Sequence, residues 1–104
     1  MKILLDHCTP RQVAQLLPGH QVLTAFRMGW ADLDNGDLIT AAEGGSFELF
    51  ITSDRRIRYQ QNLTGRKIAI LVVSQDLQLL REHKAELLSV VNSIQPGAYR
   101  EQNW

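Results

Sequence analysis

The sequence predicts an α/β domain with a mainly parallel sheet, because short apolar runs alternate along the chain with segments of helical periodicity. Two further observations agree with this class. The chain has 104 residues, the length of one domain, and turn or capping residues separate the runs. Right-handed crossovers place helices on both faces of such a sheet. We therefore expect one domain over residues 1–104, a three-layer α/β/α sandwich with roughly four strands.

Four apolar runs are the candidate strands. The run that ends at Asp6 is short and wholly apolar, which is typical of a strand buried on both faces. The run Ile-Ala-Ile-Leu-Val-Val is the most β-like stretch of the chain. Strands are predicted at residues 3–5, 21–25, 47–52 and 68–73.

Capping residues and apolar spacing predict four helices. Thr9 is placed to cap the first, with Pro10 at its first position. Asp34 is placed to cap the second, which ends at Gly44-Gly45. The last helix is long and amphipathic. Helices are predicted at residues 10–17, 34–43, 54–61 and 76–94. The tail at residues 98–104 is expected to be loosely held.

Composition narrows the class of protein. Eleven basic residues balance eleven acidic ones, which argues against a chain coated in positive charge for nucleic-acid binding. The single cysteine, Cys8, excludes an internal disulfide framework. No apolar run reaches the roughly 18 residues of a membrane span, and Asp6 comes too early for a signal peptide. We expect a cytoplasmic protein that does not enter a membrane.

Charge is uneven along the chain. Residues 28–54 hold six acids and no Lys or Arg, whereas residues 55–67 hold five bases and no acid. This switch suits a divalent-cation site beside a rim that contacts phosphate. Two differently solvated faces explain it equally well.

Four carboxylates are expected near the carboxyl ends of the strands, where ligands bind in sheets of this class. Asp6 and Asp54 follow predicted strands, and Asp34 and Asp37 lie at the start of a predicted helix. Carboxylates gathered in this way favour Mg²⁺ or Mn²⁺, because a cation offsets their repulsion. Each has a structural alternative: Asp34 and Asp54 as helix caps, Asp37 as a first-turn acid, and Asp6 as an acceptor of backbone N–H groups.

Three other features leave alternatives open. Cys8 is either a small buried hydrophobe or, with a histidine, a nucleophile. Trp30 either stacks a base or covers the core. The amide-rich residues 59–62 either contact bases or end a helix.

Several short motifs follow one another in an order typical of one family. They are residues 2–6 (KILLD) followed by Pro10, residues 19–22 (GHQV), residues 35–39 (NGDLI) with Ala41-Ala42, residues 47–54 (FELFITSD) and residues 59–63 (YQQNL). In these motifs the chain resembles the small PIN-like domains of bacteria, relatives of the PIN-domain ribonucleases that include toxins of toxin–antitoxin pairs. The resemblance covers about residues 2–73.

The resemblance implies a PIN-like fold and an acidic cluster that binds Mg²⁺ or Mn²⁺ and cuts RNA. Asp6 matches the acid that closes the first strand, and Asp54 matches the acid of the Thr-x-Asp stretch. The family's third acid position holds Asn35, with Asp34 or Asp37 as the nearest charged substitutes. The common Glu after the first Asp is His7 here.

The leading hypothesis is a metal-dependent endoribonuclease that acts as the toxin of such a pair. Its catalytic residues are expected to be Asp6, Asp54 and Asp37, its further metal ligands Asn35 and Asp34, and its RNA-binding residues Arg55, Arg56 and Arg58. Its expected partners are RNA, an antitoxin-like protein and a second copy of the chain. The alternative is a PIN-like binding module without turnover, and a weaker one is a receiver-like or nucleotide-binding domain.

Overall fold

The computed structural model describes all residues 1–104, and its centre is a sheet of five strands that are all parallel. The strands are β1 (Lys2–Leu5), β2 (Gln21–Thr24), β3 (Leu49–Thr52), β4 (Ala69–Val72) and β5 (Tyr99–Glu101). Their order in the sheet is β2-β1-β3-β4-β5. The chain therefore leaves β1 toward one edge to form β2 and then crosses to the other side of β1 to form β3. In doubly wound sheets, ligands bind beyond the carboxyl ends of the strands at such a reversal.

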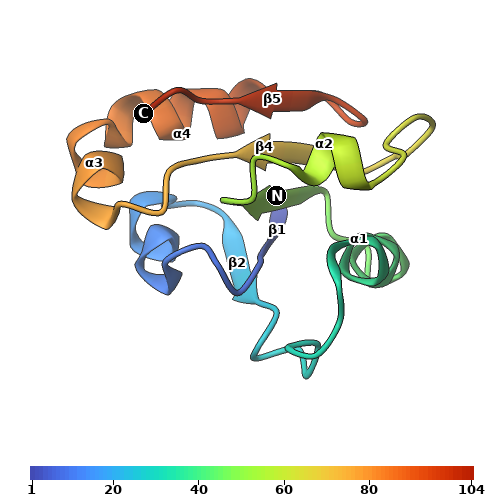
Figure 1. Cartoon of the computed structure of the whole chain (residues 1–104). Helices are drawn as coiled ribbons and strands as arrows, with labels where there is room; N and C mark the ends of the chain where they lie inside the picture. Colours follow the sequence, from blue (N-terminus) through green and yellow to red (C-terminus); the bar gives the residue numbers. More distant parts are fainter.

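Helices cover both faces of the sheet (Figure 1). On one face lie the 3₁₀ helix η1 (Arg11–Leu16) and the helices α3 (Leu77–Glu82) and α4 (Lys84–Ser93). On the other lie α1 (Asn35–Gly44) and α2 (Ile57–Gln60). The expected α/β class with three layers is confirmed.

Two apolar cores fill the spaces between these layers. Because side chains alternate along a strand, Ile3 and Leu5 enter one core and Leu4 enters the other. The first core continues into Val13, Leu17, Leu80, Leu87 and Val91, and the second into Leu38, Ile39, Ala42 and Ile57. Nearly all of these side chains are fully buried.

The four predicted strands are present, but a fifth was not predicted. Residues 98–104 are not a loose tail: Tyr99–Glu101 pair with β4 as strand β5. Trp104 packs against the first core and stacks on His83, with ring centroids 4.9 Å apart. The expectation was wrong because these contacts join residues distant in sequence, and Tyr-Arg-Glu has no apolar run of its own.

The first helix also differs from the expectation. It is a 3₁₀ helix over Arg11–Leu16, with Pro10 in the N-cap position and no side-chain cap. The Thr9 hydroxyl does not cap it but donates to Asp6 Oδ1 at 2.9 Å. A buried carboxylate is a stronger acceptor than the alternatives available to Thr9, and it determines where the hydroxyl points.

The segment predicted as one helix over residues 76–94 is divided in two. Asp76 caps α3 by accepting from the N–H groups of Gln78 and Leu79. His83 then leaves helical geometry, with φ −108° and ψ 25°, and α4 begins at Lys84. No helix of the chain has both the length and the apolar character needed to cross a membrane.

Candidate functional site

A polar cleft of about 320 Å³ lies beyond the carboxyl ends of β1 and β3, next to the start of α1. This is the position at which the strand order reverses, so the sheet topology and the cleft agree. Its lining residues are Asp6, His7, Cys8, Asp34, Asn35, Asp54, Gln60 and Gln61. The cleft therefore contains most of the residues that the sequence singled out.

Asp6 is a buried carboxylate, only 3% exposed, directly after β1. Its Oδ1 accepts from Thr9 Oγ1 at 2.9 Å and from the Cys8 backbone N–H at 3.1 Å. The Thr52 hydroxyl donates to its Oδ2, and the Cys8 thiol lies 3.1 Å from both oxygens. The carboxylate is held in one orientation by donors from its own loop and from β3.

Thr52 connects the two strand-end acids. Its fully buried hydroxyl donates to Asp6 and accepts from the Asp54 backbone N–H at 3.1 Å. The position of one acid is thereby tied to the backbone of the other. This role of Thr52 was not predicted from the sequence. The only signal was a hydroxyl residue two positions before Asp54, at the end of an apolar strand.

Asp54 is the more accessible acid, with its side chain 20% exposed. Its Oδ2 accepts from the Asn35 side-chain amide at 3.1 Å. Its Oδ1 accepts from the Arg56 backbone N–H at 2.9 Å and pairs with Arg56 Nε at 3.5 Å. Asp54 therefore holds the residue before α2 and also contacts the first residue of α1.

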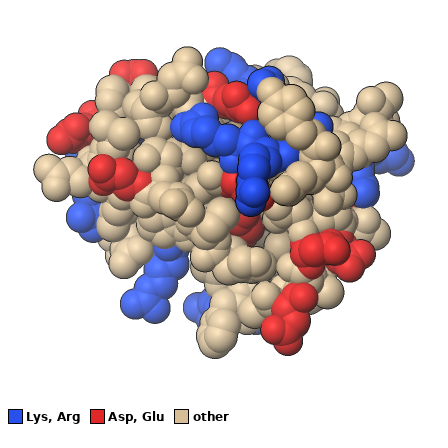
Figure 2. All heavy atoms as spheres, viewed as in Figure 1, with Lys and Arg blue, Asp and Glu red and all other residues tan.

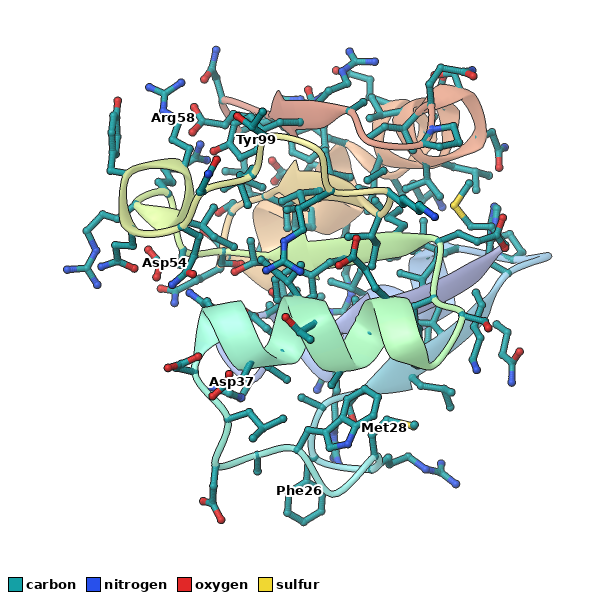
Figure 3. The ribbon with its side chains drawn as sticks, turned by 90° about the vertical axis from the view of Figure 1, so that its right-hand side faces the viewer. Phe26, Met28, Asp37, Asp54, Arg58 and Tyr99 are labelled. Carbon is teal, nitrogen blue, oxygen red and sulfur yellow. The ribbon has the colours of Figure 1, made fainter.

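Asp34 and Asp37 have different positions. Asp34 is the N-cap of α1, where it accepts from the Asp37 backbone N–H at 2.8 Å, and it also lines the cleft. Asp37 is exposed and is not among the lining residues. Figure 3 shows Asp37 and Asp54 on opposite sides of the first turn of α1. The structure thus brings Asp6, Asp34, Asn35 and Asp54 together and leaves Asp37 outside.

The three predicted basic residues lie beside the acids but have different partners. A second hollow of about 410 Å³ shares Cys8 and Asp54 with the cleft and is lined by Arg55 and Arg56. Arg55 Nη2 donates to the Gln102 carbonyl at 2.8 Å, and Arg58 pairs with Glu101 at 3.8 Å. In Figure 2, blue side chains gather around acidic ones on the upper half of the visible face. Arg56, with its side chain 77% exposed, is the basic group nearest the acids.

Cys8 and Trp30 have structural roles here. Burial, together with the hydrogen bond to Asp6 and its charge, raises the pKa of the Cys8 thiol. The protonated thiol therefore acts as a donor to Asp6, and the nucleophile is the less favoured alternative. Trp30 packs edge-on against Phe47, with centroids 6.0 Å apart, beside the second core. This position supports the covering role.

The cleft offers the type of ligand atoms, oxygens, that suit a hard divalent cation. Carboxylates from Asp6 and Asp54 with an Asn35 carboxamide are the oxygen ligands that Mg²⁺ and Mn²⁺ prefer. No group of three or more His, Cys, Asp or Glu side chains is placed to share one ion. A cation here would take one or two carboxylates, with water and substrate phosphate as the remaining ligands. Asp54 is the more accessible ligand, because its side chain is 20% exposed whereas Asp6 is only 3% exposed.

These features define a small α/β domain with an acidic cleft at the carboxyl edge of its sheet. Comparison of the chain with protein-family models, with curated proteins and with solved structures found no match. The candidate site therefore rests on the residues and the geometry described above.

Proposed function

We propose that the chain is a PIN-like, metal-dependent endoribonuclease whose active site is the cleft around Asp6 and Asp54. One observation carries the proposal. Two carboxylates at the ends of adjacent parallel strands line one cleft at the reversal of strand order, and the Thr52 hydroxyl links the Asp6 carboxylate to the Asp54 backbone N–H. A carboxylate is costly to bury unless donors surround it, and here Cys8, Thr9 and Thr52 donate to Asp6 at the wall of the cleft.

The residues of the cleft would have different roles in this reaction. Asp54 and Asp6 would hold Mg²⁺ or Mn²⁺, with Asn35 and Asp34 at the same rim. A bound divalent cation activates water and stabilises negative charge on a reacting phosphodiester. Thr9 and Thr52 fix the Asp6 carboxylate, and Asn35 fixes Asp54. Arg56 would contact phosphate, because its guanidinium is exposed beside Asp54.

RNA is the proposed substrate, in keeping with the resemblance of the chain to PIN-like domains. The same resemblance makes an antitoxin-like protein and a second copy of the chain the proposed partners, and the cytoplasm the proposed location. Arg55 and Arg58 have a smaller part than the sequence suggested, since both are engaged with β5 residues or the segment after it.

The test is cleavage of a mixed RNA pool with Mg²⁺, Mn²⁺ or EDTA. Wild type, Asp6→Asn and Asp54→Asn are compared with Asp37→Asn, a first-turn acid outside the cleft. We expect cleavage with metal only, a loss of about 100-fold or more in the two strand-end variants, and near wild-type rates for Asp37→Asn. Circular dichroism establishes that each variant is folded. Cutting that survives both strand-end substitutions would exclude this site.

A second function is favoured by the contact between Asn35 and Asp54. An amide where the family has an acid leaves two carboxylates instead of three, as expected of a PIN-like binding module without turnover. Phe26, which is 78% exposed in the connection from β2 to α1, offers an apolar contact for a partner protein. Folded protein that binds a partner but cuts no RNA with either metal would support this second function.

A further inference from the structure

Tyr59 is exposed, yet its ring is held in place. The residue lies on α2 and is 75% exposed, one of two large apolar side chains that face solvent to this extent. The Arg58 guanidinium lies 4.7 Å from the ring centroid and donates to the Tyr59 hydroxyl at 2.5 Å. Arg58 in turn pairs with Glu101, which accepts from the Tyr99 hydroxyl at 2.6 Å. The contacts to β5 thus order an aromatic face that the protein itself does not cover.

The two residues after Tyr59 lead into the cleft. Gln60 and Gln61 line it together with Asp6 and Asp54, and neither side-chain amide makes a hydrogen bond within the protein. Asn62 differs, because its Oδ1 accepts from the Thr64 N–H at 3.1 Å and closes a turn. The two glutamine amides are therefore free to bind a ligand, whereas the Asn62 side chain belongs to the turn that follows α2.

Gly36 makes room for the Gln61 side chain. A Cβ at position 36 would lie 2.6 Å from Gln61 Oε1 and 3.2 Å from its Cδ. Gln61 therefore rests against the first turn of α1, beside the Asn35 that holds Asp54. The free amide lies beside the proposed catalytic residues.

This arrangement has the chemistry of a site for unpaired bases. An exposed aromatic ring can stack on any base. It reaches the face of a base only where that base lies outside a duplex. A carboxamide supplies one acceptor and two donors for a base edge. Arg56, which is exposed beside Asp54, provides a positive charge for the phosphates of the RNA backbone.

We propose that Tyr59 and Gln61 are base-binding residues beside the cleft. One base stacks on Tyr59, and the edge of a neighbouring base meets the Gln61 amide. This inference rests on the proposed ribonuclease function and identifies the residues that would bind the bases of its substrate.

The experiment measures fluorescence anisotropy of labelled oligonucleotides in EDTA, so that no cleavage occurs. The probes are a short oligoadenylate, its duplex with oligouridylate, and an abasic strand of equal length and charge. The variants are Tyr59→Leu and Gln61→Ala, with Phe26→Leu as the matched control. Phe26 is equally exposed and lies at the opposite end of the molecule from Arg58 (Figure 3).

The expected result is base-dependent binding that is lost with Tyr59. Tyr59→Leu weakens binding of the oligoadenylate about tenfold and leaves the abasic strand unchanged, Gln61→Ala has a smaller effect in the same direction, and Phe26→Leu has none. Duplex that binds as tightly as the single strand, no binding of any probe, or equal effects of Tyr59→Leu and Phe26→Leu would overturn the inference.

The two proposals fail in different ways. Metal-dependent cleavage of RNA with Tyr59-independent binding overturns the base site and leaves the nuclease intact. Tyr59-dependent binding without cleavage in either metal overturns the nuclease and supports the base site as a binding surface. In an active enzyme, Tyr59→Leu should raise KM for single-stranded RNA and leave kcat nearly unchanged, since the ring touches no reacting atom.

Discussion

The Asn35 side-chain amide donates to Asp54 Oδ2 across 3.1 Å and joins the first residue of α1 to the loop after β3. The amide can approach the carboxylate closely because it carries donors and no charge. An acid at position 35 would repel Asp54 unless a cation lay between them. The contact therefore allows the cleft to be stable without metal, and it limits the negative charge available to bind one.

Asn35→Asp should make the cleft more dependent on metal. Without metal, we expect the free energy of unfolding to fall by about 1–2 kcal/mol, because two carboxylates then face each other. Saturating Mn²⁺ should restore it and raise the melting temperature above that of metal-loaded wild type. Thermal unfolding with EDTA and with Mn²⁺ measures both effects. Asn35→Ala is the control, and an equal response of the two variants to Mn²⁺ would contradict a metal site at this contact.

Thr52→Val should destabilise the fold although the two side chains have nearly the same shape. The change leaves Asp6 without one donor and the Asp54 backbone N–H without its acceptor. We expect a loss of about 2–3 kcal/mol in urea unfolding. Thr52→Ser keeps the hydroxyl, and its expected loss is about 1 kcal/mol for the missing methyl. A valine variant as stable as wild type would show that the hydroxyl bridge contributes nothing.

Glu43 predicts a specific pH dependence of stability. Its carboxylate accepts from Arg66 Nη1 at 2.6 Å and from the N–H groups of Lys67 and Ile68. Burial alone raises the pKa of Glu43, but these donors lower it by more than burial raises it. The net pKa therefore lies below the ordinary value of 4.5. The contribution to stability is therefore complete above that value and disappears as the pH falls through the folded-state pKa.

Comparison of wild type with Glu43→Gln tests this dependence. Wild type should be more stable by about 1–2 kcal/mol near neutral pH, and the difference should shrink below about pH 4. Urea unfolding at several pH values measures it, with Glu82→Gln on the exposed surface of α3 as control. A difference that stays constant down to the acid range would refute a lowered pKa.

Trp104→Ala should destabilise the whole domain and not only the last residues. The ring stacks on His83 with an angle of 4° between planes and packs against the first core. Its loss should cost about 2 kcal/mol in the free energy of unfolding. Asn103→Ala, an exposed neighbour, should be close to neutral. Equal stability of the two variants would support the loose tail that the sequence suggested.

Much of the fold could be predicted from local pattern. The runs that became β1, β3 and β4 are apolar on both faces, and a strand buried between two layers needs that composition. The Asp34 cap was also predictable, because a cap depends only on residues within one turn. Strand β5 was not, since it depends on a partner distant in sequence. The break at His83 was not either, since the apolar spacing of residues 76–94 continues across it.

The acids of the candidate site could be predicted from the sequence, but their tertiary contacts could not. The rule that ligands bind beyond the carboxyl ends of parallel strands predicts from the sequence alone that Asp6 and Asp54 lie near one another. The role of Thr52 was missed because its contact with Asp6 joins residues that are distant in sequence. The engagement of Arg55 and Arg58 with the C-terminal residues was missed because β5 itself was missed.

The most direct test of the central claim is a Mn²⁺ titration followed by electron paramagnetic resonance of the free ion. Wild type should bind about one Mn²⁺ per chain, Asp54→Asn should bind at least about tenfold more weakly, and Asp37→Asn should bind like wild type. Equal binding by wild type and Asp54→Asn, or no binding by folded wild type, would contradict a metal site in the cleft between β1, β3 and α1.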